Sequence, residues 1–206
     1  MIQQIWEPNL TVVFAGTAVD EVSDGLGFHH LHPKDRFWSL LELSRITADR
    51  IISQQERKAL TEGRAKGNLS DPIRSMFLLK KTSQVLRLGI GLTNLNQRIV
   101  VPNDKDKNAR PSDDDLRQFF DSVEQFSPAL VAFVTPPGIF VQAFKYRSVD
   151  AVEEPGVQPF TIGQSEVWLL GSTIAMLRGE SLSNQEDAFF GLAERYADLR
   201  KGSGSP

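Results

Sequence analysis

The sequence predicts an α/β protein, a three-layer α/β/α sandwich around a central, mainly parallel sheet of about four strands. Short continuous apolar runs, typical of strands that are buried on both faces of a sheet, occur at three places in the chain. Helical patterns of apolar residues lie between these runs. Strands that alternate with helices form layered sandwiches with right-handed crossovers, which gives the predicted fold class.

The expected strands each end at a residue or turn that stops a strand. The first covers residues 10–15 and ends at Gly16, the second covers 129–134 and ends at a Thr-Pro-Pro-Gly turn, and the third covers 166–170 and ends at Gly171. In open parallel sheets, ligands bind in the crevice beyond the carboxyl ends of the strands. We therefore expect the chemistry in the turns that follow these strands and in the helix-to-loop passage around residues 91–94.

Two helices and two loops are expected between the strands. Apolar residues recur at helical spacing over 36–43 and again over 114–126. The polar, Pro-flanked residues 102–115 predict a surface loop that leads into the second helix, with Ser112 or Asp113 as its N-cap. Residues 61–75, which contain Gly, Lys and Arg, predict a further loop.

Length and composition predict a single domain over residues 1–201, followed by a flexible Gly- and Ser-rich tail at 202–206. The chain has 206 residues and no cysteine, which excludes a disulfide scaffold, a thiolate zinc site and a cysteine nucleophile. No apolar run reaches the length of a membrane span and no leader pattern opens the chain, so we expect a cytoplasmic protein without a membrane partner.

Charge and histidine placement limit the choice of ligands. The net charge of −3 means that any nucleic-acid contact would need a local basic patch. All three histidines, His29, His30 and His32, fall within four residues. Adjacent His29 and His30 cannot both aim easily at one ion, and the chain has no HExxH motif, so we expect no metal and read these imidazoles as solvent-exposed or stacking.

Several segments resemble the mismatch-specific uracil-DNA and thymine-DNA glycosylases, a branch of the uracil-DNA glycosylase superfamily. Residues 12–16 (VVFAG) are similar to that branch's V-V-F-C-G strand end, and residues 32–38 (HPKDRFW) are similar to its H-P-x-N-R-F-W signature. Residues 89–95 and 166–173 resemble two further segments of the branch. The matches keep their order across residues 10–178.

The resemblance implies a monofunctional DNA glycosylase that acts in base excision repair. Such an enzyme flips uracil or another deaminated or damaged base out of the duplex and hydrolyses its N-glycosidic bond. It implies DNA as the partner, no cofactor and a monomer. Backbone amides at strand ends and helix N-termini can stabilise the anion of the departing base.

The chain departs from the branch in the turn after the first strand. That turn reads G-[IN]-N-P-G in the branch, and its Asn positions the attacking water, whereas Ala18 stands in that place here. Asp20 is the first catalytic candidate, because a carboxylate in this turn can orient water and stabilise the sugar cation. The alternative to a catalytic role is that Asp20 caps the turn or faces solvent. Asn94 is the second catalytic candidate.

The resemblance also implies binding residues. His30 aligns with the base-stacking aromatic, and Ser172 with the amide that reads the base edge, so broad base specificity is expected. The substrate-binding residues are expected to be Gly16, Thr17, Ala18, Val19, His30 and Ser172. The DNA-binding residues are expected to be Ser23, Ala175, Met176, Leu177 and Arg178, the last four at the position of the wedge that fills the duplex. Arg36, Phe37 and Trp38 are expected to serve packing and anchoring.

Two other hypotheses remain open. A catalytically weak or inactive glycosylase-like module could bind damaged or abasic DNA, which Ala18 favours and Asp20 opposes. A nucleotide- or phosphate-handling α/β protein is the third hypothesis, although the chain lacks the GxGxxG and GxxxxGK[ST] fingerprints.

Overall fold

The central sheet has five strands, one more than expected, and confirms the predicted fold class. A computed structural model describes residues 2–48, 51–65, 71–102, 107–174 and 180–202. Its sheet has the order β2-β1-β3-β5-β4. Four strands run parallel, and β4 at one edge is antiparallel to β5. The strands are β1 Val12–Asp20, β2 Ile90–Val101, β3 Leu130–Val134, β4 Gly156–Ile162 and β5 Ser165–Leu169.

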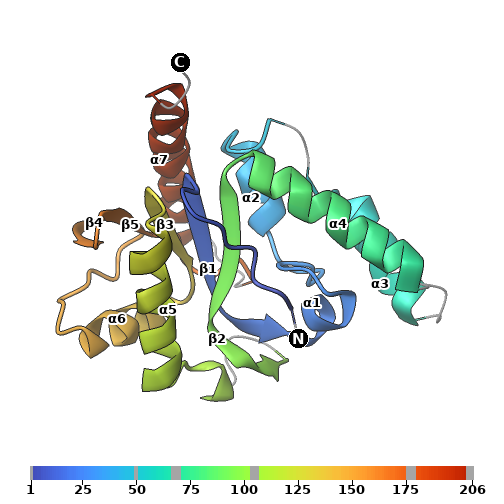
Figure 1. Cartoon of the computed structure of the whole chain (residues 1–206), viewed down its shortest axis with the longest axis horizontal. Helices are drawn as coiled ribbons and strands as arrows, with labels where there is room; N and C mark the ends of the chain where they lie inside the picture. The colour runs from blue at the N-terminus through green and yellow to red at the C-terminus, as the bar shows by residue number, and fades with distance from the viewer. Residues whose placement is uncertain (1, 49–50, 66–70, 103–106, 175–179, 203–206) are drawn as a thin grey trace.

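Helices cover both faces of this sheet, which makes the three layers (Figure 1). The helices α5 and α6 pack on one face, and α2, α4 and α7 pack on the other. The bounds are α1 Glu21–Leu26, α2 Phe37–Leu43, α3 Gln54–Ala65, α4 Asp71–Arg87, η1 Lys107–Ala109, α5 Asp113–Phe126, α6 Pro137–Tyr146 and α7 Glu180–Gly202. Within the described residues, no helix is both long enough and apolar enough to span a membrane.

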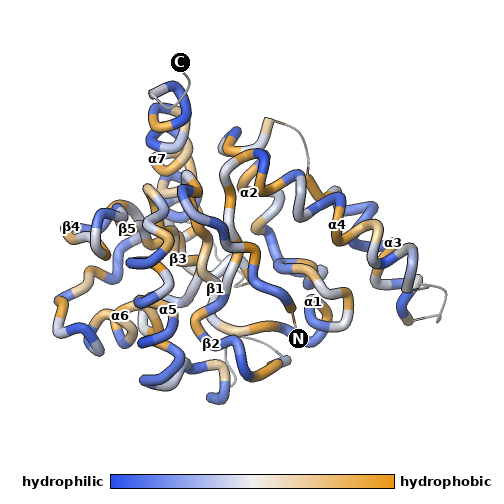
Figure 2. The backbone as a smooth tube through the Cα atoms, viewed as in Figure 1, coloured by the Kyte–Doolittle hydropathy of each residue, from blue (hydrophilic) through white to orange (hydrophobic). Residues whose placement is uncertain are grey.

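Two hydrophobic cores lie on opposite sides of the sheet, because side chains alternate along each strand. On β1, Val12 and Phe14 belong to the core beneath α2 and α7, and Ala15 belongs to the core beneath α5 and α6. The second core is built mainly from edge-on and tilted phenylalanines, with Phe133 of β3 at 5.0–5.5 Å from three neighbouring rings. Hydrophobic and hydrophilic residues alternate along α4, whose apolar side faces the first core (Figure 2).

The three expected strands are confirmed, and so is the N-cap of α5. Ser112 makes a capping box with Asp115, in which each side chain bonds the other residue's backbone N–H. The expected packing role of the HPKDRFW segment is also confirmed. Phe37 and Trp38 are buried in the core, and Arg36 Nη2 lies 2.8 Å from Glu186 Oε1 of α7.

Three local predictions are wrong. The first strand does not turn at Gly16, because β1 continues to Asp20 through pairing with β2. Residues 91–94 are not a passage from helix to loop but the start of β2. The loop expected at 61–75 contains the end of α3 and the start of α4, since Leu60 and Phe77 pack against the core and hold both helices in place. Residues 66–70 lie outside the described part of the chain.

The strand order positions the site. From β1 the chain passes to β2 on one side and then to β3 on the other. The crevice at such a reversal is where open α/β sheets bind ligands, at the carboxyl ends of the strands. The flexible tail was expected to begin at Gly202, but Gly202 is the last residue of α7. The rest of the expected tail, residues 203–206, lies outside the described chain.

Candidate active site

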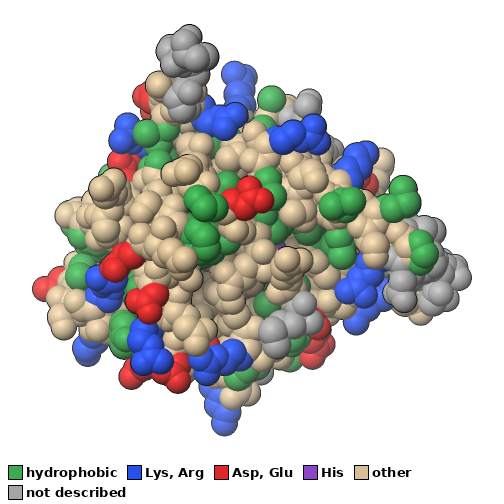
Figure 3. All heavy atoms as spheres, in the orientation of Figure 1, with side chains coloured by type: hydrophobic (Ala, Val, Ile, Leu, Met, Phe, Trp, Pro, Cys, Tyr) green, Lys and Arg blue, Asp and Glu red, His purple; other side chains and the backbone are tan. Residues whose placement is uncertain are grey.

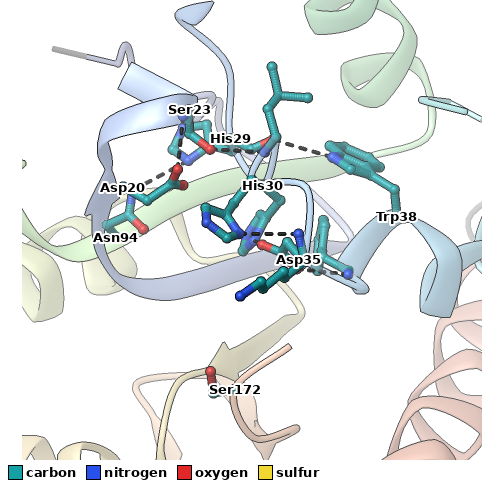
Figure 4. A network of polar contacts seen from close by, with 12 residues as sticks. Asp20, Ser23, His29, His30, Asp35, Trp38, Asn94 and Ser172 are labelled. Atoms are coloured by element: carbon teal, nitrogen blue, oxygen red, sulfur yellow. Dashed lines mark hydrogen bonds and ion pairs between the residues drawn. The ribbon is translucent and has the colours of Figure 1, made fainter. Parts of the chain in front are cut away.

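A small pocket lies at the carboxyl end of β1 and collects segments that are distant in the sequence. Its wall contains the loop between α1 and α2, the ends of the strands and the N-terminal segment (Figure 4). The residues are Ile2, Gly16 to Asp20, Ser23, His29, His30, Asp35, Asn94, Val134, Thr173 and Ile174. The expected convergence of the strand-end segments is therefore confirmed. The wall is mainly polar, which suits a reactive site better than a packing void.

A His–Asp pair stands at the centre of this pocket. His30 Nδ1 lies 2.8 Å from Asp35 Oδ2, and Asp35 Oδ1 accepts a 2.9 Å hydrogen bond from the Phe37 N–H. The His30 ring stacks on the Phe37 ring with centroids 3.9 Å apart. The carboxylate and the phenyl ring thus fix both the tilt and the rotation of the imidazole.

Asp35 is buried and is held as a carboxylate. Burial raises its pKa, but the charge of His30 and hydrogen bonds from His30, Thr173 and the Phe37 N–H together bring the pKa below its usual value. Arg57 of α3 supports the loop from below by donating to the backbone oxygens of Asp35 and His32. An ionised Asp35 accepts at Oδ2, so His30 donates through Nδ1–H.

A second histidine fixes the orientation of Asn94. His29 is 3% exposed, and burial, followed by the charge of His30, lowers its pKa to about 3, so it is neutral. Its Nε2–H donates to the Gln3 carbonyl at 3.2 Å, which leaves Nδ1 to accept from Asn94 Nδ2 at 3.4 Å. The Asn94 amide nitrogen is therefore directed at His29, and its Oδ1 is directed at Gly16.

Gly16 permits this arrangement because it has no side chain. A Cβ at Gly16 would lie 2.5 Å from Asn94 Oδ1 and 3.8 Å from His30 Cε1. The first distance is shorter than any ordinary contact, so only glycine allows Asn94 to sit against β1. Asn94 Oδ1 and the His30 ring consequently lie within 4 Å of one point on the strand.

Asp20 lines the pocket but also has a structural role. Its Oδ1 accepts hydrogen bonds from the Val22 N–H at 3.0 Å and the Ser23 N–H at 2.9 Å, which makes Asp20 the N-cap of α1. The helix ends at Gly27, whose φ of 81° is the left-handed conformation that glycine adopts most easily. The alternative of a capping residue is thus confirmed, and the catalytic role of Asp20 stays a prediction.

Removing the Asp20 side chain is expected to lower the stability of the fold, whereas asparagine at this position should still cap α1. Asp20→Ala should lower the free energy of unfolding by about 1 kcal/mol, and Asp20→Asn by only a few tenths, because an amide oxygen caps nearly as well. Urea unfolding of both variants measures this, with Glu21→Ala, an exposed neighbour, as the control. Equal losses for Ala and Asn would show that the charge of Asp20, rather than the cap, stabilises the fold.

The remaining expected site residues are distributed unevenly. Thr17, Ala18 and Val19 line the pocket on β1, but Ser172 does not, and its neighbour Thr173 reaches Asp35 instead (Figure 4). Ser23 is 2% exposed and accepts a hydrogen bond from the Leu31 N–H, so it holds the loop in place. Ala175, Met176, Leu177 and Arg178 lie outside the described residues.

Sequence reasoning missed Asp35, Thr173 and the part played by His29. The expectation that the histidines are exposed is wrong for His29, because its ring fills a buried space between the N-terminal segment and β2. His30 stacks on Phe37 within the fold, and its expected stacking on a flipped base stays a prediction. The five-residue spacing between His30 and Asp35 in a Pro-containing loop was the one available signal for the pair.

The described pocket is small. The space open to the centre of a water-sized sphere is about 20 Å³, enough for about one water molecule. The wall residues include Asn94, and also His30 and Thr17, whose Nε2 and hydroxyl are buried and have no hydrogen-bond partner among the described residues. The fold and the pocket together define an α/β protein with a polar, water-sized site at its strand ends. No protein-family model matches the chain.

Proposed function

We propose that the protein is a DNA glycosylase that hydrolyses the N-glycosidic bond of uracil or another deaminated or damaged base. One observation carries this proposal. The segments that resemble the glycosylases, which lie far apart in the sequence, meet at one pocket, where residues 16–20, Asn94, Asp35 and Thr173 share a wall. Hydrolysis of this bond requires water beside the sugar, and the pocket has the size and the polar atoms to hold one.

The groups around the pocket suit the charges that develop in the reaction. Breaking the bond between the base and the sugar puts positive charge on the sugar and negative charge on the base. Asn94 Oδ1 faces the first of these charges with a lone pair, and the Asp20 carboxylate adds a full negative charge to the same wall. The orientation of Asn94 is set by the neutral His29, so no reorganisation is needed when the charge appears.

Substrate entry requires the pocket to widen, because a nucleobase is larger than one water. The apolar wall residues Ile2 and Ile174 lie outside the helices and strands. Their displacement would open the pocket without breaking the sheet. Flipping a base costs a few kcal/mol and least for damaged or mismatched bases, so the opening favours lesions.

DNA attraction would rest on few residues. Lys and Arg side chains are spread over the face in Figure 3 and are interspersed with Asp and Glu, in line with the net charge of −3. Affinity would then depend on a small number of phosphate contacts and would fall with salt accordingly.

A strand-cleavage assay tests the proposal. Duplex oligonucleotides that carry uracil, hypoxanthine, xanthine or an etheno base are incubated with excess protein and treated with alkali, which cuts at abasic sites. We expect cleavage of at least one of these substrates, and a loss of about 10-fold or more in single-turnover rate for Asn94→Ala, which removes a positioned group. Gln97→Ala, an amide truncation on the same strand outside the pocket, is the control.

The same assay identifies the alternatives. A gel shift on damaged or abasic DNA without cleavage by the wild type would replace the enzyme with a binding module. Neither a shift nor cleavage would overturn the proposal and favour a function unrelated to DNA.

A further inference from the structure

His30 lines the pocket, and one of its ring nitrogens, Nε2, takes no part in the contacts described above. The His30 side chain is 10% exposed, and its Nδ1 is committed to Asp35. Its Nε2 is buried and has no hydrogen-bond partner among the described residues. A buried polar nitrogen without a partner is costly, and in a neutral ring whose Nδ1 carries the proton, Nε2 is the basic atom.

The fold holds His30 in place against a backbone preference. Its φ is 57°, the left-handed region, which residues with a Cβ adopt at a cost of about 1–3 kcal/mol. Three contacts compensate for this: the stack on Phe37, the bond to Asp35, and the support that Arg57 gives to the Asp35 backbone. Such strain gathers at functional sites, where surrounding structure over-determines the conformation.

The pocket that His30 lines has room for about one water. Asn94 Oδ1 and His30 Cε1 both lie within 4 Å of the point where a Gly16 side chain would begin. The Thr17 hydroxyl, a second buried polar atom without a partner in the described chain, belongs to the same wall. His30 Nε2 and the Thr17 hydroxyl are closed to a water molecule in this state. Once the pocket widens for substrate, a water beside them would have a basic nitrogen, an amide oxygen and a hydroxyl around it, and a buried water typically makes about three hydrogen bonds.

We propose that His30 is the general base of the reaction, that its Nε2 takes a proton from the attacking water, and that Asp35 is its positioning residue. This inference rests on the proposed glycosylase function. It explains how the attacking water can be activated although Ala18 stands in place of a water-holding amide. Asp35 keeps the proton of the neutral ring on Nδ1 and stabilises the imidazolium that forms, the arrangement by which a carboxylate assists a catalytic histidine.

The step balances as a hydrolysis. The water oxygen forms a bond to C1′ of the sugar, and the electron pair of the bond between C1′ and the base leaves with the base. One proton of the water passes to His30 Nε2, and the hydroxyl remains on C1′. The imidazolium then returns its proton to the departed base or to solvent, which restores neutral His30. The products are the free base and an abasic site.

A different role for His30 follows from the resemblance, in which its ring stacks on the flipped base. The two roles require different atoms. Stacking needs a planar ring, whereas proton transfer needs the lone pair on Nε2. The variant His30→Phe keeps an aromatic ring and loses the nitrogen, so it separates them, and His30→Gln supplies a polar group that cannot accept the proton at neutral pH.

Single-turnover excision from a uracil-containing duplex, measured with protein in excess, is the test. We expect His30→Phe and His30→Gln each to lose about 10²-fold or more of the rate at pH 7.5, within the 10²–10⁴-fold range of general-base catalysis. His32→Phe, the same replacement in the same loop outside the pocket, should keep the wild-type rate. Thermal melting of each variant reports whether it is folded, and His30→Gln serves if His30→Phe is not.

The pH profile tests Asp35 separately. The titratable groups that share the pocket with His30 are Asp20, His29 and Asp35. The wild-type rate should fall on the acid side, because a protonated imidazole accepts no proton, and this acid limb should vanish in His30→Gln. Asp35→Asn keeps the shape of the side chain and removes the charge, so it should lower the rate and move the acid limb to lower pH, because the imidazolium loses the carboxylate that stabilises it. A folded Asp35→Asn with an unmoved limb would contradict the positioning role.

The outcomes separate this inference from the function it rests on. An active wild type with an equally active His30→Phe overturns the general base and leaves the glycosylase in place, with His30 as a stacking residue. A wild type that excises none of the tested bases overturns the proposed function, and the role of His30 falls with it. Excision that collapses in both His30 variants and not in His32→Phe supports both.

Discussion

Gly16→Ala is expected to abolish excision, with a loss of about 100-fold or more, and to lower the free energy of unfolding by about 1–3 kcal/mol. The new methyl group would lie 2.5 Å from Asn94 Oδ1, so the amide must move away from β1. Forcing one carbon into a packed site costs about this much. The displaced amide would also lose its bond to His29 and its place beside His30.

Urea unfolding and single-turnover excision measure the two effects. Gly138→Ala is the matched control, because a Cβ at Gly138 meets nothing within 4 Å and alanine suits its helix α6. That variant should keep the rate of the wild type and should be as stable as the wild type or slightly more stable, because alanine is the better helix former. If Gly16→Ala behaves like Gly138→Ala, the close approach of Asn94 to β1 does not hold in solution.

The stability of the protein is expected to fall between pH 6.5 and pH 4.5, largely because of His29. Its pKa is lowered from 6.5 to about 3 in the folded state. Between these values the unfolded chain binds a proton at this residue that the folded chain does not, so the free energy of unfolding decreases as the pH falls. One such group contributes at most about 1.4 kcal/mol per pH unit.

Urea unfolding at pH 7.0, 6.0 and 5.0 tests this for the wild type and for His29→Gln. The variant should be less stable at pH 7 and should lose clearly less stability on acidification. His32→Gln, at a half-buried position, is the control. Asp35 does not affect the pH dependence measured in this range, because its pKa is lowered from 3.8 and its contribution to the stability is lost only at more acidic pH. Equal slopes for the wild type and His29→Gln would show that His29 is not buried as a neutral ring.

Apolar runs sufficed to predict the central strands, and the edges of the sheet were harder. The runs of β1, β3 and β5 are continuous because these strands are buried on both faces. The strand β2 has four exposed or half-buried residues near its end, at 97–100, and β4 alternates as an edge strand does. Their polar residues read as loop without knowledge of their neighbours in the sheet.

The candidate site was predictable in place but not in detail. Strand ends located Gly16, Asp20 and Asn94 in one pocket, since parallel strands present their carboxyl ends at the same edge. The bond between His30 and Asp35 depends on a left-handed residue and a loop conformation that no periodicity encodes. Ser172 is predicted from the resemblance alone, and the pocket is lined by its neighbour Thr173 instead, because similarity of sequence does not fix where a side chain points beyond the end of a strand.

The central position of β1 between β2 and β3 sets the order in which the protein can mature. The pocket joins Ile2 to Thr173, so it exists only after the crossovers to β2, β3 and β5 have closed. Contacts so distant in sequence form slowly, because the entropy of closing long loops opposes them until packing rewards it. During synthesis, the HPKDRFW loop therefore leaves the ribosome long before the pocket can form. A nascent chain that ends before β5 lacks the contact between Thr173 and Asp35.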